Sequence, residues 1–180
     1  MSTLFVNNLN TASGTNITVP TGKKLIVTDA GALTAPGMIL QTVRSEFRTY
    51  TSFDSTSFAN SGLTGTITPK FSSSKILVTV IANGIFHNGS AKYMFLNLYR
   101  GSSSIASLDN GVGYNTSGDE INYGIHSNVY QHEDSPSTTS ATTYALYWKK
   151  SDTGQTAGIN NYNSVNGSTL STITLQEIAQ

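Results

Sequence analysis

The chain has 180 residues, enough for one ordinary domain with an appendage, and its ten basic and ten acidic residues give a formal net charge of zero. Ser and Thr together number 49 and Asn and Gly 16 each, whereas only 11% of the residues are charged. This composition lacks the basic excess typical of nucleic-acid-binding proteins. Because there is no cysteine, disulfides, thiolate catalysis and cysteine-bound metals are excluded. Hydroxyl and amide side chains on this scale favour β-strands and turns.

The first 37 residues alternate short β-type runs with turn residues. The runs are Leu4–Val6, Asn16–Val19 and Lys24–Thr28, and the turns are Val19–Gly22 and Ala35–Gly37. Each run offers too few apolar side chains to form a core, and isolated strands are marginal in water unless they pair. We therefore predict a β leader at residues 1–37, ordered by another copy of the chain or by another protein. A second domain is expected at residues 38–180.

Residues 38–180 show strand and turn signals throughout, and no segment keeps a helical period. In chain order we expect strands at Met38–Tyr50, Leu63–Pro69, Lys75–Ile85, Tyr93–Arg100, Ile105–Leu108, Ile121–Gln131, Thr142–Lys149 and Thr169–Gln180, with a loop at Phe53–Gly62. About eight strands separated by turn clusters predict an all-β fold, a jelly-roll-like antiparallel β-sandwich. Its expected core residues include Leu77, Val78, Val80, Leu96, Leu98, Leu146 and Ile173.

The segment Tyr93–Arg100 has an unusual second face. Three aliphatic or thioether side chains alternate there with Tyr93, Phe95 and Tyr99, where a strand facing water should be polar. Aromatic residues are enriched in protein interfaces. We therefore predict that these three residues form the interface of a homotrimer. The alternative is a strand that is buried on both sides within one subunit.

No segment carries a recognisable catalytic pattern. His126, His132, Glu133 and Asp134 have metal-binding side chains, but their spacing fits no standard zinc site, and a solvated strand end is the favoured interpretation. A nucleophile elbow, a phosphate-binding loop and a metalloprotease helix are all missing from the sequence. We therefore expect no catalytic residue, no bound metal and no cofactor. The apolar stretches are too short to cross a bilayer, so no membrane insertion is expected.

Two polar segments, Asn110–Asp119 and Asn160–Ser168, are candidates for ligand binding. Within them the candidate residues are Tyr114, Asn115, Tyr162 and Asn163. An aromatic ring can stack on the apolar face of a sugar while amides and hydroxyls bond to its hydroxyl groups, as they do in other adaptable binding surfaces. The alternative is that the two rings only cover the edges of the sandwich.

Six segments of β-type residues follow one another in a characteristic order. They are NITVPTGKKLIV and ALTAPG in the leader, and GLTGTITPKFSSSKILVTV, FLNLYRGSSSI, SPSTTSATTYALYWKK and STITLQEIAQ in the second domain. Through these segments, most of the chain resembles the short tail-fibre and fibre-tip proteins of tailed bacteriophages, above all those that infect cyanobacteria and other aquatic bacteria.

The resemblance implies a homotrimeric structural protein of the virion, made in the host cytoplasm, that binds a host surface glycan without catalysis. Residues 1–37 would then dock on other virion proteins. Because such fibres usually also have an anchoring domain and a long shaft, a trimeric capsid decoration protein is the main alternative. A carbohydrate-binding module and a glycan-degrading enzyme are further alternatives.

Overall fold

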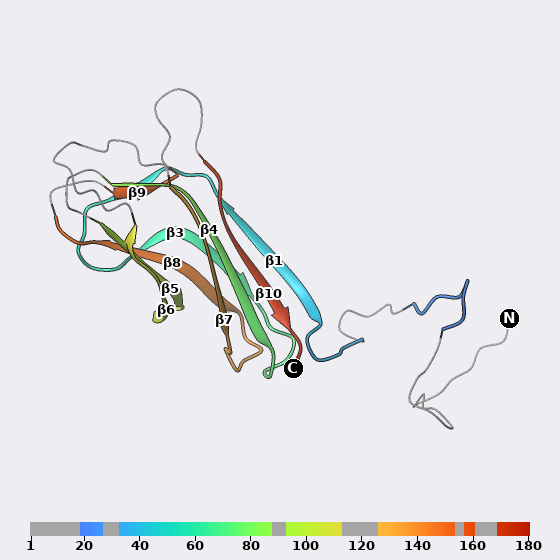
Figure 1. Cartoon of the computed structure of the whole chain (residues 1–180). Helices are drawn as coiled ribbons and strands as arrows, with labels where there is room; N and C mark the ends of the chain where they lie inside the picture. The colour runs from blue at the N-terminus through green and yellow to red at the C-terminus, as the bar shows by residue number, and fades with distance from the viewer. Residues whose placement is uncertain (1–18, 27–32, 88–92, 113–125, 154–156, 161–168) are drawn as a thin grey trace. The chain divides into compact units, whose positions relative to one another are not determined.

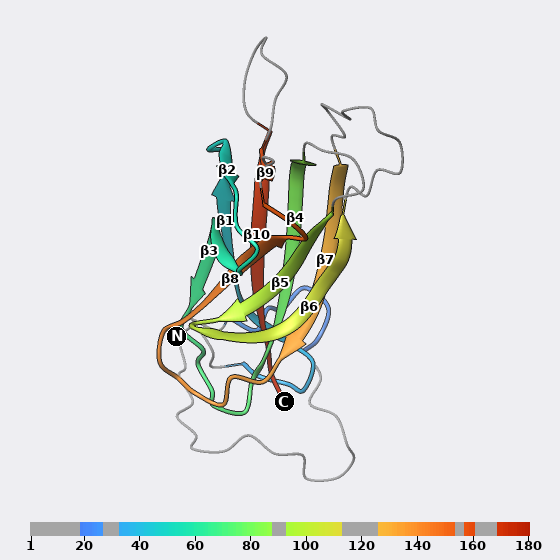
Figure 2. The same cartoon turned by 90° about the vertical axis from the view of Figure 1, so that its left-hand side faces the viewer.

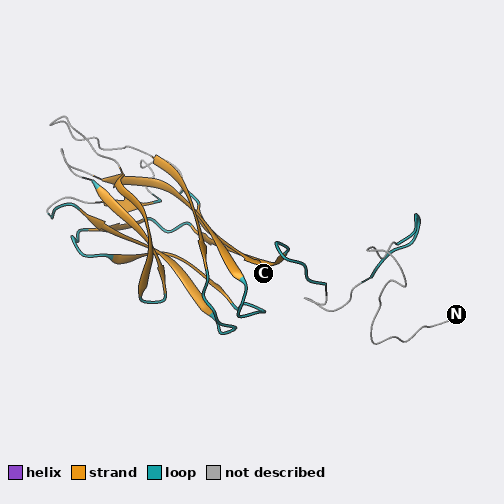
Figure 3. Ribbon diagram, turned by 60° about the horizontal axis from the view of Figure 1, so that its bottom comes forward, coloured by secondary structure: helices purple, strands orange, loops and turns teal. Residues whose placement is uncertain are grey.

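The computed structural model describes residues 19–26, 33–87, 93–112, 126–153, 157–160 and 169–180 (Figure 1). Every regular element within these ranges is a β-strand (Figure 3). The chain divides into two units, Met1–Leu33 and Thr34–Gln180, so the second unit begins slightly earlier than the predicted boundary after Gly37. Backbone hydrogen bonds join the beginning of this unit to its last strand, because Gly37 donates to Ala179 and Ala179 donates to Met38.

The described part of the first unit is a turn with exposed apolar neighbours. The amide of Lys23 donates to the carbonyl oxygen of Pro20 at 3.0 Å, and Gly22 has a φ of 79°, which confirms the turn predicted there. Val19, Leu25 and Ile26 are exposed. Residues 24–26 of the predicted β-run at residues 24–28 form no strand within the single chain, and the pairing with another copy or another protein that was expected to order this run stays a prediction. The runs at residues 4–6 and 16–18 lie outside the described residues.

The first sheet of the second unit is antiparallel. Its four long strands have the order β1 (Ile39–Phe47), β10 (Ser171–Ile178), β4 (Lys75–His87) and β7 (His126–Asp134) (Figure 1). Two short strands extend this sheet: the end of β4 also pairs with β9 (Ala157–Ile159), and β9 pairs with β2 (Thr51–Phe53). The predicted central position of the Lys75–Ile85 strand is confirmed, since β4 has neighbours on both sides. β2 and β9 were not predicted, because three residues show too little alternation to reveal a strand.

The second sheet lies across the first. Its order is β3 (Ala59–Ile67), β8 (Thr142–Lys150), β5 (Met94–Arg100) and β6 (Ser103–Val112), and Figure 2 shows β8, β5 and β6 in front of β10 and β4. The expected antiparallel β-sandwich is therefore confirmed. The predicted loop at Phe53–Gly62 was wrong at both ends, because β2 includes Phe53 and β3 begins at Ala59.

The core fills the space between the two sheets. Its buried side chains include Leu63, Ile76, Val78, Val80, Leu96, Leu98, Tyr144, Leu146, Trp148, Ile173 and Leu175. The ring of Trp148 stacks on Phe53, with centroids 4.2 Å apart. Six of the seven predicted core residues are buried, and Leu77 is the error. Because Ile76 and Val78 point inward, strand alternation places Leu77 on the outer face, where it is partly exposed.

Glu177 is a buried carboxylate at one end of the first sheet. It accepts hydrogen bonds from Gln41 Nε2 at 2.6 Å and from the backbone amides of Lys70 at 2.7 Å and Phe71 at 3.2 Å. Burial alone would raise the pKa of Glu177, but these hydrogen bonds outweigh it and hold the pKa below its ordinary value. The ionised form is therefore part of the folded structure.

Two further carboxylates join the sheets along the β6–β7 margin. Asp134 on β7 accepts from Arg100 Nη1 at 2.8 and 2.9 Å and from the Tyr144 hydroxyl at 2.7 Å. Asp109 on β6 accepts from the Tyr130 hydroxyl at 2.8 Å. Burial, together with these hydrogen bonds and the nearby negative charge, raises the pKa of both tyrosines, so both hydroxyls remain donors.

We expect Leu98→Ala to lower the free energy of unfolding by about 2–5 kcal/mol, because it opens a cavity in a buried site. Leu77→Ala removes the same atoms from a partly exposed position and should cost less than about 1 kcal/mol. Urea unfolding of both variants measures the difference. Equal losses of unfolding free energy would show that the inward and outward side chains of β4 or β5 are assigned incorrectly.

We expect acid to destabilise the fold through Glu177. Because its pKa is lower in the folded than in the unfolded chain, its contribution is complete above about pH 4.3 and is lost as the pH falls towards the folded value. The thermal midpoint of the natural chain should therefore fall more steeply from pH 6 to pH 3 than that of Glu177→Gln. Glu133→Gln, at an exposed ion pair with Lys75, should follow the natural chain. Parallel curves for all three proteins would contradict this role.

Candidate functional site

The four predicted ligand residues, Tyr114, Asn115, Tyr162 and Asn163, lie outside the described residues. Their role stays a prediction. Asn160, at the start of the same predicted recognition loop, is described and has a different function. It is fully buried, and its Nδ2 donates to the backbone oxygens of Phe47 at 2.9 Å and Thr49 at 3.1 Å. It thus bridges the break between β1 and β2.

A continuous group of side chains covers part of the outer face of the second sheet. We call it the aromatic cluster, and it consists of Phe58, Tyr93, Phe95, Tyr99, Tyr147 and Lys149. All six are partly exposed. Their outward direction follows from alternation, because the intervening residues of β5 and β8 fill the core. The three aromatic residues predicted from β5 are therefore brought together on one outer face.

The rings of the cluster pack against one another. Tyr99 and Tyr147 stack with centroids 3.8 Å apart and an interplanar angle of 17°. Phe58 tilts against Tyr99 at 6.2 Å, and Tyr93 meets Phe95 edge to face at 5.1 Å. Such contacts restrict ring motion and stabilise aromatic pairs. The alternative of a β5 strand buried on both sides within one subunit does not hold, since these rings retain exposed surface.

Lys149 introduces a positive charge into the cluster. Its Nζ lies 4.7 Å from the ring centroid of Phe95 and 5.0 Å from that of Phe58. Both distances are within the range of a cation–π interaction. The long side chain is thereby held between two rings at the outer surface, so the ammonium group has a defined position.

Amides and hydroxyls lie beside the rings. In the strand register, Tyr147 on β8 is flanked by Asn60 on β3 and by Asn97 on β5. Asn97 Nδ2 donates to Ser104 Oγ at 3.0 Å. The face therefore combines apolar rings, hydrogen-bonding groups and one cation, which is a set suited to binding.

The two carboxylates singled out in the sequence, Glu133 and Asp134, have basic or hydroxyl partners in the fold. Glu133 pairs with Lys75 at 2.5 Å on the outside of the first sheet, whereas Asp134 accepts from Arg100 and Tyr144. Among the residues that the structure describes, no group of three or more potential metal ligands is placed to hold an ion. Glu133 and Asp134 therefore already have protein partners in the fold.

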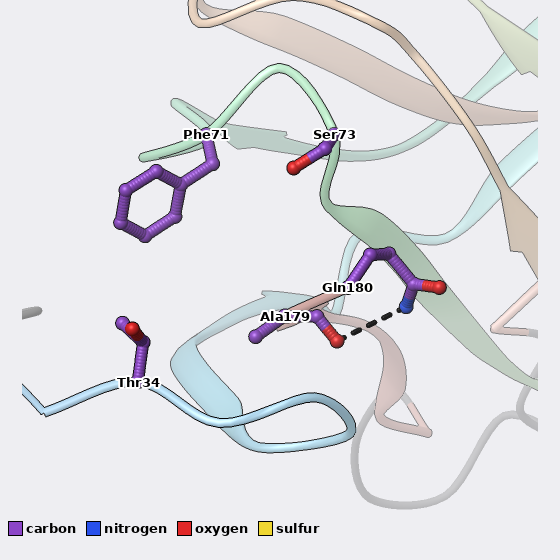
Figure 4. Close-up of a pocket in the computed structure, with 5 residues that line it drawn as sticks. All are labelled: Thr34, Phe71, Ser73, Ala179 and Gln180. Atoms are coloured by element: carbon purple, nitrogen blue, oxygen red, sulfur yellow. Dashed lines mark hydrogen bonds between the residues drawn. The ribbon is translucent and has the colours of Figure 1, made fainter.

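A small pocket of about 190 Å³ lies at the end of β10 (Figure 4). It is lined by Thr34, Phe71, Ser73, Ala179 and Gln180, and Gln180 Nε2 donates to the backbone oxygen of Ala179 at 3.1 Å. No ionisable side chain is among these lining residues. The pocket therefore offers less for recognition than the aromatic cluster does.

Sequence reasoning found only half of the cluster. It identified Tyr93, Phe95 and Tyr99, which lie on β5 or directly before it, but it missed Tyr147 and Lys149, and for Phe58 it favoured a role in covering the edge of the sandwich. A signal was present, because Tyr147 and Lys149 alternate with the apolar Leu146 and Trp148. Sequence alone did not reveal that β8 pairs with β5 and so places the two groups together.

No protein-family model matches the chain, and no curated protein matches it. None of the described segments forms a helix long and apolar enough to span a membrane.

Proposed function

We propose that the chain is a non-enzymatic structural protein of a bacteriophage virion, a tail-fibre-type appendage whose β-sandwich contacts the host surface. The observation that supports this most is the aromatic cluster, a prepacked group of rings with amides and one cation on the outer face of a sheet. Aromatic rings with adaptable polar neighbours are typical of contact surfaces. The resemblance of the leader and strand segments to fibre-tip proteins points in the same direction.

The strand order supports the jelly-roll part of the proposal. If the eight long strands are numbered one to eight along the chain, the first sheet has the order 1-8-3-6 and the second 2-7-4-5. An eight-stranded sandwich in which each sheet takes strands from both halves of the chain suits two interlocked Greek keys, as in a jelly roll.

The proposed assembly is a homotrimer, and the outer face of the first sheet offers a subunit contact. Val129 on β7 is 63% exposed and lies directly opposite the partly exposed Ile81 on β4. We therefore assign the subunit contact to Val129 and Ile81, which leaves the aromatic cluster available for the host.

A capsid decoration protein is the second candidate. The exposed Val19, Leu25 and Ile26 of the first unit favour stable docking on another protein, and decoration requires such docking as much as a tail fibre does. The two candidates differ in their position and number on the particle.

We expect the purified protein to have the mass of a trimer at micromolar concentration, and Val129→Glu to reduce it to a folded monomer. A buried carboxylate without a partner is costly at a subunit contact. Light scattering measures the mass, and circular dichroism checks the fold. Tyr99→Ser is the matched control and should remain trimeric. If Tyr99→Ser dissociates the protein and Val129→Glu does not, the interface predicted at Tyr93, Phe95 and Tyr99 is the right one.

We expect antibody labelling of intact particles to place the protein at the tail in a few copies. Label spread over the capsid would instead establish the decoration role.

Ile26→Asp should prevent incorporation into particles without unfolding the sandwich, because Ile26 lies in the first unit and is exposed. Thr21→Asp, which adds the same charge in the neighbouring turn, is the control for that variant.

A further inference from the structure

Lys149 differs from the other basic residues of the second unit that the structure describes. Those residues all contact oxygen atoms: carboxylates for Arg44, Arg48, Lys75, Arg100 and Lys150, and the backbone oxygen of Leu40 for Lys70. Lys149 instead lies between the rings of Phe95 and Phe58, and within the described chain no carboxylate forms an ion pair with it. Among the described residues, no acidic side chain therefore neutralises the charge of Lys149.

The surroundings of Lys149 leave it able to bind an anion. An ammonium group has three N–H donors, and ring faces attract its charge without providing lone pairs of oxygen. Phe95 lies opposite Lys149 in the β5–β8 register, and the next outward position of β8 is Tyr147. Cation and stacked rings are thus neighbours along one strand.

The next row of the same face supplies neutral hydrogen-bonding groups. Asn60, Tyr147 and Asn97 lie side by side across β3, β8 and β5, and Asn97 is bonded to Ser104. Amide groups can donate to and accept from hydroxyl groups. A ligand lying along β8 would therefore contact the ammonium group of Lys149 first and then the ring of Tyr147, which has an asparagine amide on either side.

We propose that the aromatic cluster binds an acidic polysaccharide of the host surface, with a uronic-acid carboxylate at Lys149. The apolar faces of the sugar rings lie on Tyr147 and Tyr99, and the sugar hydroxyls bond to Asn60 and Asn97. One cation among neutral donors suits a ligand with one carboxylate per sugar, since a densely sulfated chain calls for several basic groups. The inference rests on the proposed function only in taking the host surface as the source of the polysaccharide.

The binding test uses the full-length protein and two matched probes, an oligogalacturonate and the same oligosaccharide with its carboxylates methyl-esterified. Calorimetry should show that the acid binds about tenfold more tightly than the ester, because only the acid can form a charge-assisted hydrogen bond with Lys149. Lys149→Gln should remove that tenfold preference and Lys149→Arg should restore most of it. Lys75→Gln, which makes the same charge change on the outside of the other sheet, should behave like the natural chain.

The ring contribution is tested separately. Tyr147→Ala should weaken both probes by a similar factor, since ring stacking does not depend on the carboxylate. Equal affinity of the natural chain for acid and ester, or no binding of either, would overturn the proposal. Dissociation of the trimer by Tyr147→Ala would also overturn it, because the face would then be occupied by a second copy. These results are independent of the particle labelling, which alone decides between tail and capsid.

Discussion

Burial of every second side chain on β5 and β8 determines what the outer face of the second sheet presents. Leu96, Leu98 and Leu146 are fully buried between the sheets, so their neighbours in sequence must point outward. A shift of one residue in β8 would place Lys149 in the core and Leu146 in water, and a shift of one residue in β5 would place Leu96 and Leu98 in water, each at a large cost in free energy. The contact chemistry of the face is therefore maintained by the same hydrophobic burial that stabilises the sandwich.

Polar side chains inside the sandwich form hydrogen bonds at the margins of the sheets and at the ends of strands. Asp134 and Asp109 link β7 to strands of the other sheet, and Glu177 closes the turn after β3. Asn160 binds backbone oxygens where β1 gives way to β2, and its Oδ1 accepts from Ser171 Oγ at 2.7 Å. These buried groups are hydrogen-bonded, as buried polar groups in native structures generally are.

Sequence reasoning worked where the information was local. Alternation within Met94–Arg100 separated the core side from the aromatic side, and turn residues at Val19–Gly22 predicted the turn that the hydrogen bond from Lys23 to Pro20 closes. It failed where the outcome depended on strands distant in sequence. The aliphatic character of Leu77 gave no hint that its side of β4 faces outward, and nothing near Asn160 indicated that its amide would be buried among strand ends. The homotrimer, the virion and the ligand loops stay predictions.

The ion-paired side chains on β1 affect how readily the protein aggregates at high concentration. β1 is an edge strand of the first sheet, and Arg44 on it pairs with Glu46 at 3.2 Å, while Arg48 reaches the same carboxylate at 3.4 Å. An unpaired strand edge is a template for further strands, and charged side chains are a common means of blocking it. In a chain of zero net charge there is little general repulsion between molecules. Protection against edge-to-edge aggregation at high local concentration therefore falls largely on these few side chains.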